Sequence, residues 1–136
     1  MGENKRAHLL MIQNLVDRLS QNSFLIKGWS ISIVAAMFAL SAQNTNLVFI
    51  YLAYFPSIIF WILDSYFLRQ EKLYRALYNY VRTMGEEKID FSLDAAAFSD
   101  DVPSWGHILG SKTLLAFHGS IILSILIVMI IALFIS

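Results

Sequence analysis

The distribution of charged residues constrains this chain more than any other feature of its sequence. No Asp, Glu, Lys or Arg occurs between Gly28 and Leu63, and none follows Lys112. A transmembrane helix needs about 20 predominantly apolar residues, so each gap is long enough for membrane spans. We therefore expect an all-α integral membrane protein with three transmembrane helices.

Composition narrows the classes of function. The chain has 136 residues, of which 57% are apolar and 15% charged, whereas soluble domains carry about 45–50% apolar and about 25% charged residues. Its net charge of zero gives no reason to expect a nucleic-acid partner. The absence of Cys excludes disulfides, thiolate zinc sites and cysteine nucleophiles.

The segment before the first span has the pattern of an amphipathic helix over residues 5–22. Its polar positions share one arc of a 3.6-residue period, and most of its apolar positions share the other. Such a helix lies either on the membrane surface or against its own protein. Surface helices usually have a more basic polar face, whereas Asp17 here offsets Arg18. The sequence therefore favours packing against the protein.

The first two spans are expected to form a tight antiparallel hairpin. We place span 1 at residues 24–42, with Trp29 in the interfacial belt. A short uncharged turn leads into span 2 at residues 46–68, where Pro56 predicts a local kink. Beyond that span the same helix continues to residue 83 as a cytoplasmic extension.

Asp64 is the one acidic residue within an apolar run, which makes it a functional candidate. Lys27 lies about as far from the turn on span 1 as Asp64 lies on span 2, so we expect an ion pair between them. A proton or ion relay is the alternative, although span 2 has few other polar groups. His118, in span 3 at residues 114–135, either titrates as a gate or donates a hydrogen bond to a neighbouring helix.

Two stripes of small residues are expected to be helix-packing faces, because small side chains let helices approach closely in lipid. They comprise Ser32, Ala36 and Ala39 in span 1, and Ala116, Ser120 and Ser124 in span 3. These faces suggest a homo-oligomer.

The cytoplasmic part of the second helix carries an apolar stripe that must be covered. Either the N-terminal helix or a partner subunit is expected to cover it. The partner-docking candidates are Leu73, Tyr74, Leu77 and Tyr78, together with Trp105 in the cytoplasmic loop over residues 84–111. Tyrosines interleaved with arginines are also typical of nucleotide-binding surfaces, but Glu71 and the neutral net charge favour packing.

All ten Lys and Arg residues lie on one side of the proposed spans: four precede the charge-free part of span 1 and six lie between spans 2 and 3. The positive-inside rule then places the N-terminus and the 84–111 loop in the cytoplasm. The C-terminus is expected on the periplasmic or extracellular side.

No group of residues in the sequence predicts catalysis. The three His residues, His8, His107 and His118, lack the spacing of metal ligands. The segment from Gly110 to Thr113 lacks the glycine spacing and Gly-Lys pair of a phosphate loop. We therefore expect a protein that is not an enzyme and uses no cofactor.

Several motifs together resemble a group of small bacterial membrane proteins. They are Lys27-Gly28-Trp29, Asp64 with Tyr66-Phe67-Leu68, and Phe117-His118-Gly119. The resemblance runs from about Asn22 to Ile121. Members of this group often lie beside TIR-like or other nucleotide-signalling proteins in anti-phage defence loci. The layout is also loosely similar to the two-span SLATT effectors, from which the third span departs.

The resemblance implies bacterial origin and a partner-dependent role, with no catalytic role to transfer. Our first hypothesis is a non-enzymatic inner-membrane effector or anchor subunit that acts with a cytoplasmic protein partner, and the resemblance suggests anti-phage defence as its setting. The alternatives are a homo-oligomeric channel that uses Asp64 and His118, and a passive membrane scaffold for an enzyme docked on the 84–111 loop.

Overall fold

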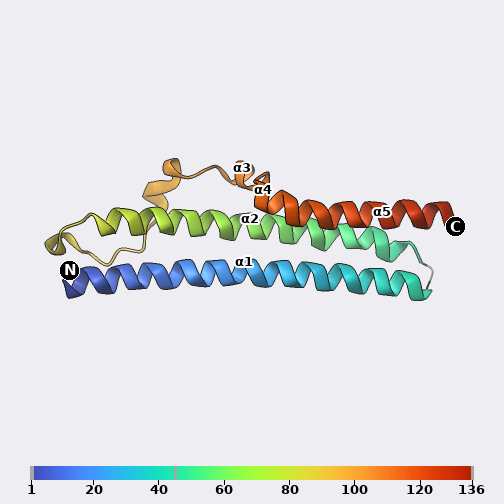
Figure 1. Ribbon diagram of the computed structural model, residues 1–136, viewed down its shortest axis with the longest axis horizontal. Coiled ribbons are helices and arrows are strands. Elements are labelled where there is room, and N and C mark those ends of the chain that lie inside the picture. The colour runs from blue at the N-terminus through green and yellow to red at the C-terminus, as the bar shows by residue number, and fades with distance from the viewer. Residues whose placement is uncertain (1, 45, 136) are drawn as a thin grey trace.

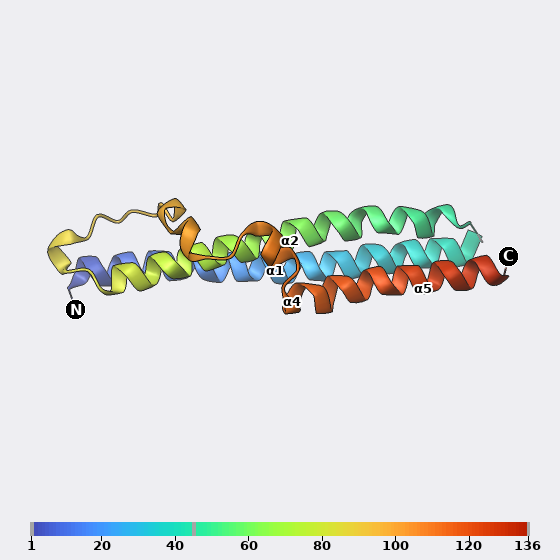
Figure 2. The ribbon, with the colours of Figure 1, turned by 90° about the horizontal axis from the view of Figure 1, so that it is seen from above.

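A long helical hairpin is the frame of the molecule. The computed structural model describes residues 2–44 and 46–135, and no β-strand occurs within them. Helix α1 spans Glu3–Asn44 and helix α2 spans Val48–Arg82. The two helices run antiparallel and side by side along the length of the molecule (Figure 1, Figure 2).

Helix α1 is continuous over 42 residues, so the amphipathic helix expected over residues 5–22 is not a separate element. It is the first half of the helix that continues into the span expected over residues 24–42. The segment contains no Pro, and its one Gly is Gly28. A single Gly in a helix costs about 1 kcal/mol. Packing along the whole length of α2 outweighs a cost of that size.

Helix α2 follows a short turn that is held by side-chain hydrogen bonds. The Asn46 Oδ1 accepts from the Val48 N–H at 3.0 Å, and the Ser41 hydroxyl donates to the Asn46 carbonyl at 3.0 Å. The helix then continues through Pro56 to Arg82 without interruption. It corresponds to the helix expected over residues 46–83.

The chain after α2 first folds over the second half of α2 and then returns along its first half (Figure 1). Its helical segments, in chain order, are η1 (Glu86–Lys88), η2 (Ala96–Asp101), α3 (Trp105–Leu109), α4 (Lys112–Leu114), the π-helical turn η3 (Leu115–Gly119) and α5 (Ser120–Ile135). The last three form one helical run of 24 residues.

Three helices of the described chain are long and apolar enough to cross a membrane. They are Glu3–Gln43, Val48–Arg82 and Lys112–Ile135. The expectation of an all-helical protein with three such helices is therefore confirmed.

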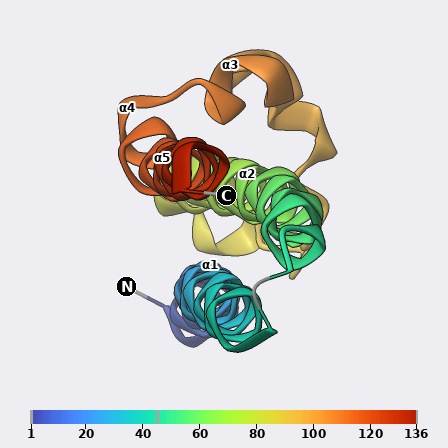
Figure 3. The same cartoon turned by 90° about the vertical axis from the view of Figure 1, so that its right-hand side faces the viewer.

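The buried apolar residues form two clusters at opposite ends of the hairpin. The span cluster joins α1, α2 and α5 and comprises Val34, Ile50, Ala53 and Ile125. We call the N-terminal half of α1 and the C-terminal half of α2 the stalk. The stalk cluster joins these halves and the segment after α2, and it comprises Leu9, Ile12, Val16, Leu73, Leu77, Val81 and Ala95. Seen along the long axis, α5 lies against α2 and farther from α1 (Figure 3). Helix α2 is thus the central helix of the molecule.

Candidate functional site

A polar cluster centred on Asp64 lies between the two apolar clusters. The Asp64 side chain is fully buried, and its Oδ2 lies 2.6 Å from the Lys27 ammonium and 2.8 Å from His118 Nε2. The Ser23 hydroxyl donates to the other carboxylate oxygen, Oδ1. Lys27 Nζ also donates to the Ser23 oxygen at 2.9 Å. Both oxygens of the carboxylate therefore have hydrogen-bond donors.

Three separate segments supply the cluster. Ser23 and Lys27 lie four residues apart on α1 and so share one face of that helix. Asp64 lies on α2, and His118 lies in the π-helical turn η3. A π-turn inserted in an α-helix is uncommon and is often found at functional sites. The cluster thus ties all three long helices together at one level.

His118 has a defined environment and tautomer. Its ring stacks on Trp61 with the centroids 6.0 Å apart and an interplanar angle of 8°. Because a carboxylate can only accept, we assign the ring proton to Nε2, which donates to Asp64. His118 Nδ1 is buried and has no hydrogen-bond partner among the described residues. An unprotonated Nδ1 is consistent with this position, since it leaves no buried N–H unpaired.

This arrangement favours the ion pair that the sequence predicts, because Lys27 neutralises Asp64 directly. His118 meets the same carboxylate, as a hydrogen-bond donor to a neighbouring helix. The described residues contain no group of three or more His, Cys, Asp and Glu residues that could hold a metal ion. The Asp64 cluster is thus a salt-bridged clamp between helices, and its carboxylate is enclosed by protein.

Two tryptophans secure the segment after α2 at the level of this cluster. The Trp61 indole N–H donates to the Leu109 carbonyl at 3.0 Å, and the Trp105 indole N–H donates to the Ser65 hydroxyl. Trp29 on α1 is largely exposed. Indole rings concentrate at the boundary between hydrocarbon and water. Their positions therefore mark the level at which the helices would leave a bilayer.

The apolar stripe on α2 that carries four of the five partner-docking candidates is covered from within the chain. Leu73 and Leu77 are buried in the stalk cluster, and Tyr74 and Tyr78 pack against it. Packing within the chain removes this apolar surface from water, which stabilises the fold without a partner. Of the five candidates, only Trp105 is exposed. Of the two covers expected from the sequence, the structure has the N-terminal half of α1, together with the segment after α2.

The small-residue faces are not used for packing within the chain. Their members Ser32, Ala36, Ala39, Ala116, Ser120 and Ser124 are all exposed. The hydroxyls of the three serines donate to carbonyls one turn earlier in their own helices. These faces are therefore available to lipid or to other chains.

The structure also shows polar contacts at the far end of the stalk that the sequence does not indicate. The Glu86 carboxylate accepts from the backbone N–H groups of Asn4 and Lys5 at 2.9 and 3.1 Å. The buried His8 donates through Nε2 to the Ser92 carbonyl at 2.7 Å. Glu86 thus caps the start of α1. Only the contact between distant segments reveals this role.

In comparisons with protein-family models, with curated proteins and with solved structures, nothing matches this chain.

Proposed function

We propose that the protein is an integral membrane protein that crosses the bilayer three times. Three long apolar helices that contain charge-free sequence support this proposal. Lys27, Asp64 and the tryptophans also lie at one level, where the helices would leave the bilayer. The one-sided distribution of Lys and Arg supports a cytoplasmic N-terminus and stalk. In this arrangement the C-terminus lies outside, and the membrane is the inner membrane of a bacterium.

We propose further that it is a non-enzymatic effector or anchor subunit that works with a cytoplasmic protein partner. The observation that carries this proposal is the continuity of α1 and α2 from the proposed spans into the stalk. A force or binding event on the stalk would act on the same rigid helices that cross the bilayer. The Asp64 cluster lies where the proposed spans meet the stalk, and it would hold α5 to α1 and α2 when these two helices respond.

The resemblance to proteins of anti-phage defence loci supports a partner of the nucleotide-signalling kind. It rests on the motifs around Lys27, Asp64 and His118, and all three of these side chains meet in the polar cluster. A role in defence is part of the same proposal.

The test is affinity purification of the full chain in mild detergent, with mass determination and identification of co-purifying proteins. A stoichiometric cytoplasmic partner would support the proposal. A chain that remains monomeric and partner-free, and whose loss leaves the host phenotype unchanged, would refute it.

A homo-oligomeric channel is the second candidate, favoured by the exposed small-residue faces. The enclosed position of Asp64 argues against a pore lined by this carboxylate, because the side chain contacts Lys27 and His118 of its own chain. Ion flux in reconstituted liposomes separates the two candidates. Flux that is lost in Asp64→Asn at equal protein content would favour the channel.

A further inference from the structure

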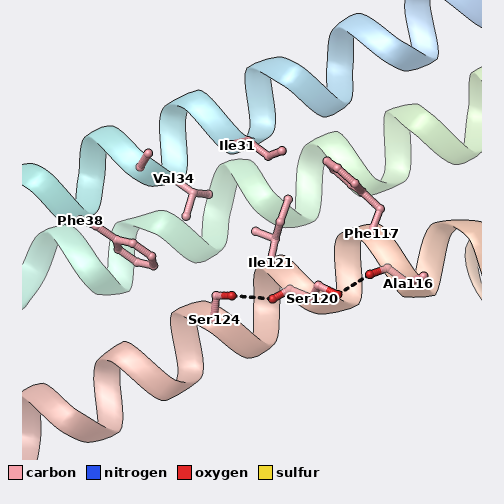
Figure 4. Close-up of a pocket in the computed structure, with 9 residues that line it drawn as sticks. Ile31, Val34, Phe38, Ala116, Phe117, Ser120, Ile121 and Ser124 are labelled. Carbon is pink, nitrogen blue, oxygen red and sulfur yellow. Dashed lines mark hydrogen bonds between the residues drawn. The ribbon is translucent and has the colours of Figure 1, made fainter.

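An apolar groove runs between α1 and α5, on the surface that would face lipid. It has a volume of about 410 Å³, which is within the range of small-molecule sites. Helix α1 contributes Ile31, Val34 and Phe38 to its lining. The π-helical turn η3 contributes Ala116, and α5 contributes Ser120 and Ser124 (Figure 4).

The groove exists because α1 and α5 both pack on α2 and have few contacts with each other. Small side chains on α5 leave the space between them open. The Ser120 hydroxyl donates to the Ala116 carbonyl, and the Ser124 hydroxyl donates to the Ser120 carbonyl. These hydroxyls are therefore satisfied within their own helix, and the groove offers a mainly apolar surface.

The length of the groove matches one leaflet of a bilayer. Phe117 lies at one end and Phe38 at the other (Figure 4). From Ala116 to Ser124 the helix rises about 12 Å at 1.5 Å per residue. Half of a hydrocarbon core of about 30 Å is about 15 Å. Phe38 also lines a second pocket that continues toward the C-terminal end of α5, so this side chain stands between the two.

Positive charge is concentrated at the Phe117 end of the groove. The Lys27 ammonium lies 5.8 Å from the centroid of the Phe117 ring. Lys112 is exposed and lies four residues before Ala116, which places it about one turn below the groove on the same side of the helix. No acidic side chain lines the groove. Asp64 balances the charge of Lys27, so Lys112 supplies the net positive charge at this end. This end therefore suits a negatively charged group.

We propose that the groove binds one acyl chain of an anionic phospholipid whose phosphate is held by Lys112. The positive charge of Lys112 at one end favours an anionic lipid over a helix of a second copy, because the spans of a second copy have no exposed acidic side chain to meet it. This inference rests on the proposed membrane integration. The bound lipid would fill the space between α1 and α5 and hold the two helices at a fixed separation.

The experiment uses the full chain, purified from membranes that have been washed with carbonate and then solubilised in mild detergent. Phosphatidylglycerol or phosphatidylcholine with identical acyl chains is added, and native mass spectrometry counts the retained lipids. Ser120→Leu fills the groove, with Ser124→Leu as a second filling variant. The matched control is Ser32→Leu, since Ser32 is also exposed and also donates within its own helix but does not line the groove. Lys112→Gln tests the headgroup contact, with Lys88→Gln as its control.

We expect one phosphatidylglycerol to be retained by the original chain and by both control variants. Ser120→Leu and Ser124→Leu should lose it. Lys112→Gln should bind phosphatidylglycerol about fivefold more weakly, because one Lys near an anionic surface contributes about that factor. The preference over phosphatidylcholine should shrink accordingly.

Two results would overturn the inference. One is equal retention of both lipids by the original chain and the filled variants. The other is a filled variant that keeps its lipid but dissociates from an oligomer, since the groove would then hold a second copy. A chain that carbonate washes from the membrane would refute membrane integration itself, whereas an integral chain without lipid preference would refute this inference alone.

Discussion

Lys27 and Asp64 form an ion pair in which the two partners are unequally buried. The distance from Nζ to Oδ2 is 2.6 Å, and the Lys27 side chain is 21% exposed whereas that of Asp64 is 0% exposed. Lys27 can therefore redirect its ammonium toward water or lipid headgroups if its partner is lost. The Asp64 carboxylate cannot reach water or headgroups in this way, because it is enclosed by three helices.

This asymmetry predicts that Lys27→Met destabilises the protein more than Asp64→Asn. Removing one partner of a buried ion pair costs about 3–5 kcal/mol, and we expect the full effect only where the carboxylate is left behind. The double variant should recover part of the loss. Unfolding in mild detergent with increasing SDS, followed by circular dichroism, measures the differences. The exposed Lys88→Met serves as control, and an Asp64→Asn variant as costly as Lys27→Met would contradict the prediction.

The attachment of the third long helix is predicted to depend on His118. His118→Phe keeps a ring against Trp61 but loses the hydrogen bond to Asp64, which should cost about 1.5–3 kcal/mol. His118→Ala should lose about 0.5–1.5 kcal/mol more through the lost ring contact. Hydrogen exchange across residues 105–119 should rise in the same order. His107 is exposed, so His107→Phe should leave exchange unchanged, and unchanged exchange in both His118 variants would rule out the clamp.

The start of α1 is predicted to depend on a side chain more than 80 residues away. Glu86→Gln removes the negative charge that accepts from the Asn4 and Lys5 N–H groups. A charge at a helix N-terminus contributes about 0.3–1 kcal/mol, so exchange at residues 4–8 should accelerate about two- to fivefold. The neighbouring Glu87 is exposed, and Glu87→Gln is the matched control. Equal effects of the two substitutions would show that Glu86 has no special role.

The buried apolar stripe is predicted to act on stability rather than directly on partner binding. Leu77→Ala should destabilise the protein by about 2–5 kcal/mol, the usual range for a buried Leu. Asn79→Ala, on the exposed side of the same helix, should change stability by less than about 0.5 kcal/mol. Both are measured by the same SDS titration. A Leu77→Ala variant with unchanged stability and lost partner binding would restore the docking interpretation.

The long-range pairing of Lys27 with Asp64 could be anticipated because a short turn between two helices fixes which depths meet. The same counting could not find Ser23, although its spacing of four residues from Lys27 was a usable signal. It also could not assign Trp61 as the stacking partner of His118. That contact depends on how α5 is rotated about its axis, and the π-turn at Leu115–Gly119 changes this rotation locally.

The exposed and buried faces of the helices were harder to predict than the helices themselves. In a hydrocarbon environment apolar side chains suit both the lipid-facing and the protein-facing surface, so periodicity hardly distinguishes them. The small-residue stripes of α1 and of the run from η3 into α5 are exposed in the single chain, and their expected role as packing faces between copies stays a prediction. In the stalk the pattern was informative, since one side of each helix there is polar.

The sequence by itself determined the three long apolar helices, the hairpin and the level at which Lys27 and Asp64 meet. These features follow from local composition and from chain length, which sequence records directly. Only the tertiary structure decided that α1 is one uninterrupted helix, that the chain itself rather than a partner covers the stalk stripe, and that Glu86 caps α1. Each of these depends on the free energy of contacts between segments far apart in the chain. Helical periodicity shows which face of a helix must be covered, but it does not show which segment covers that face.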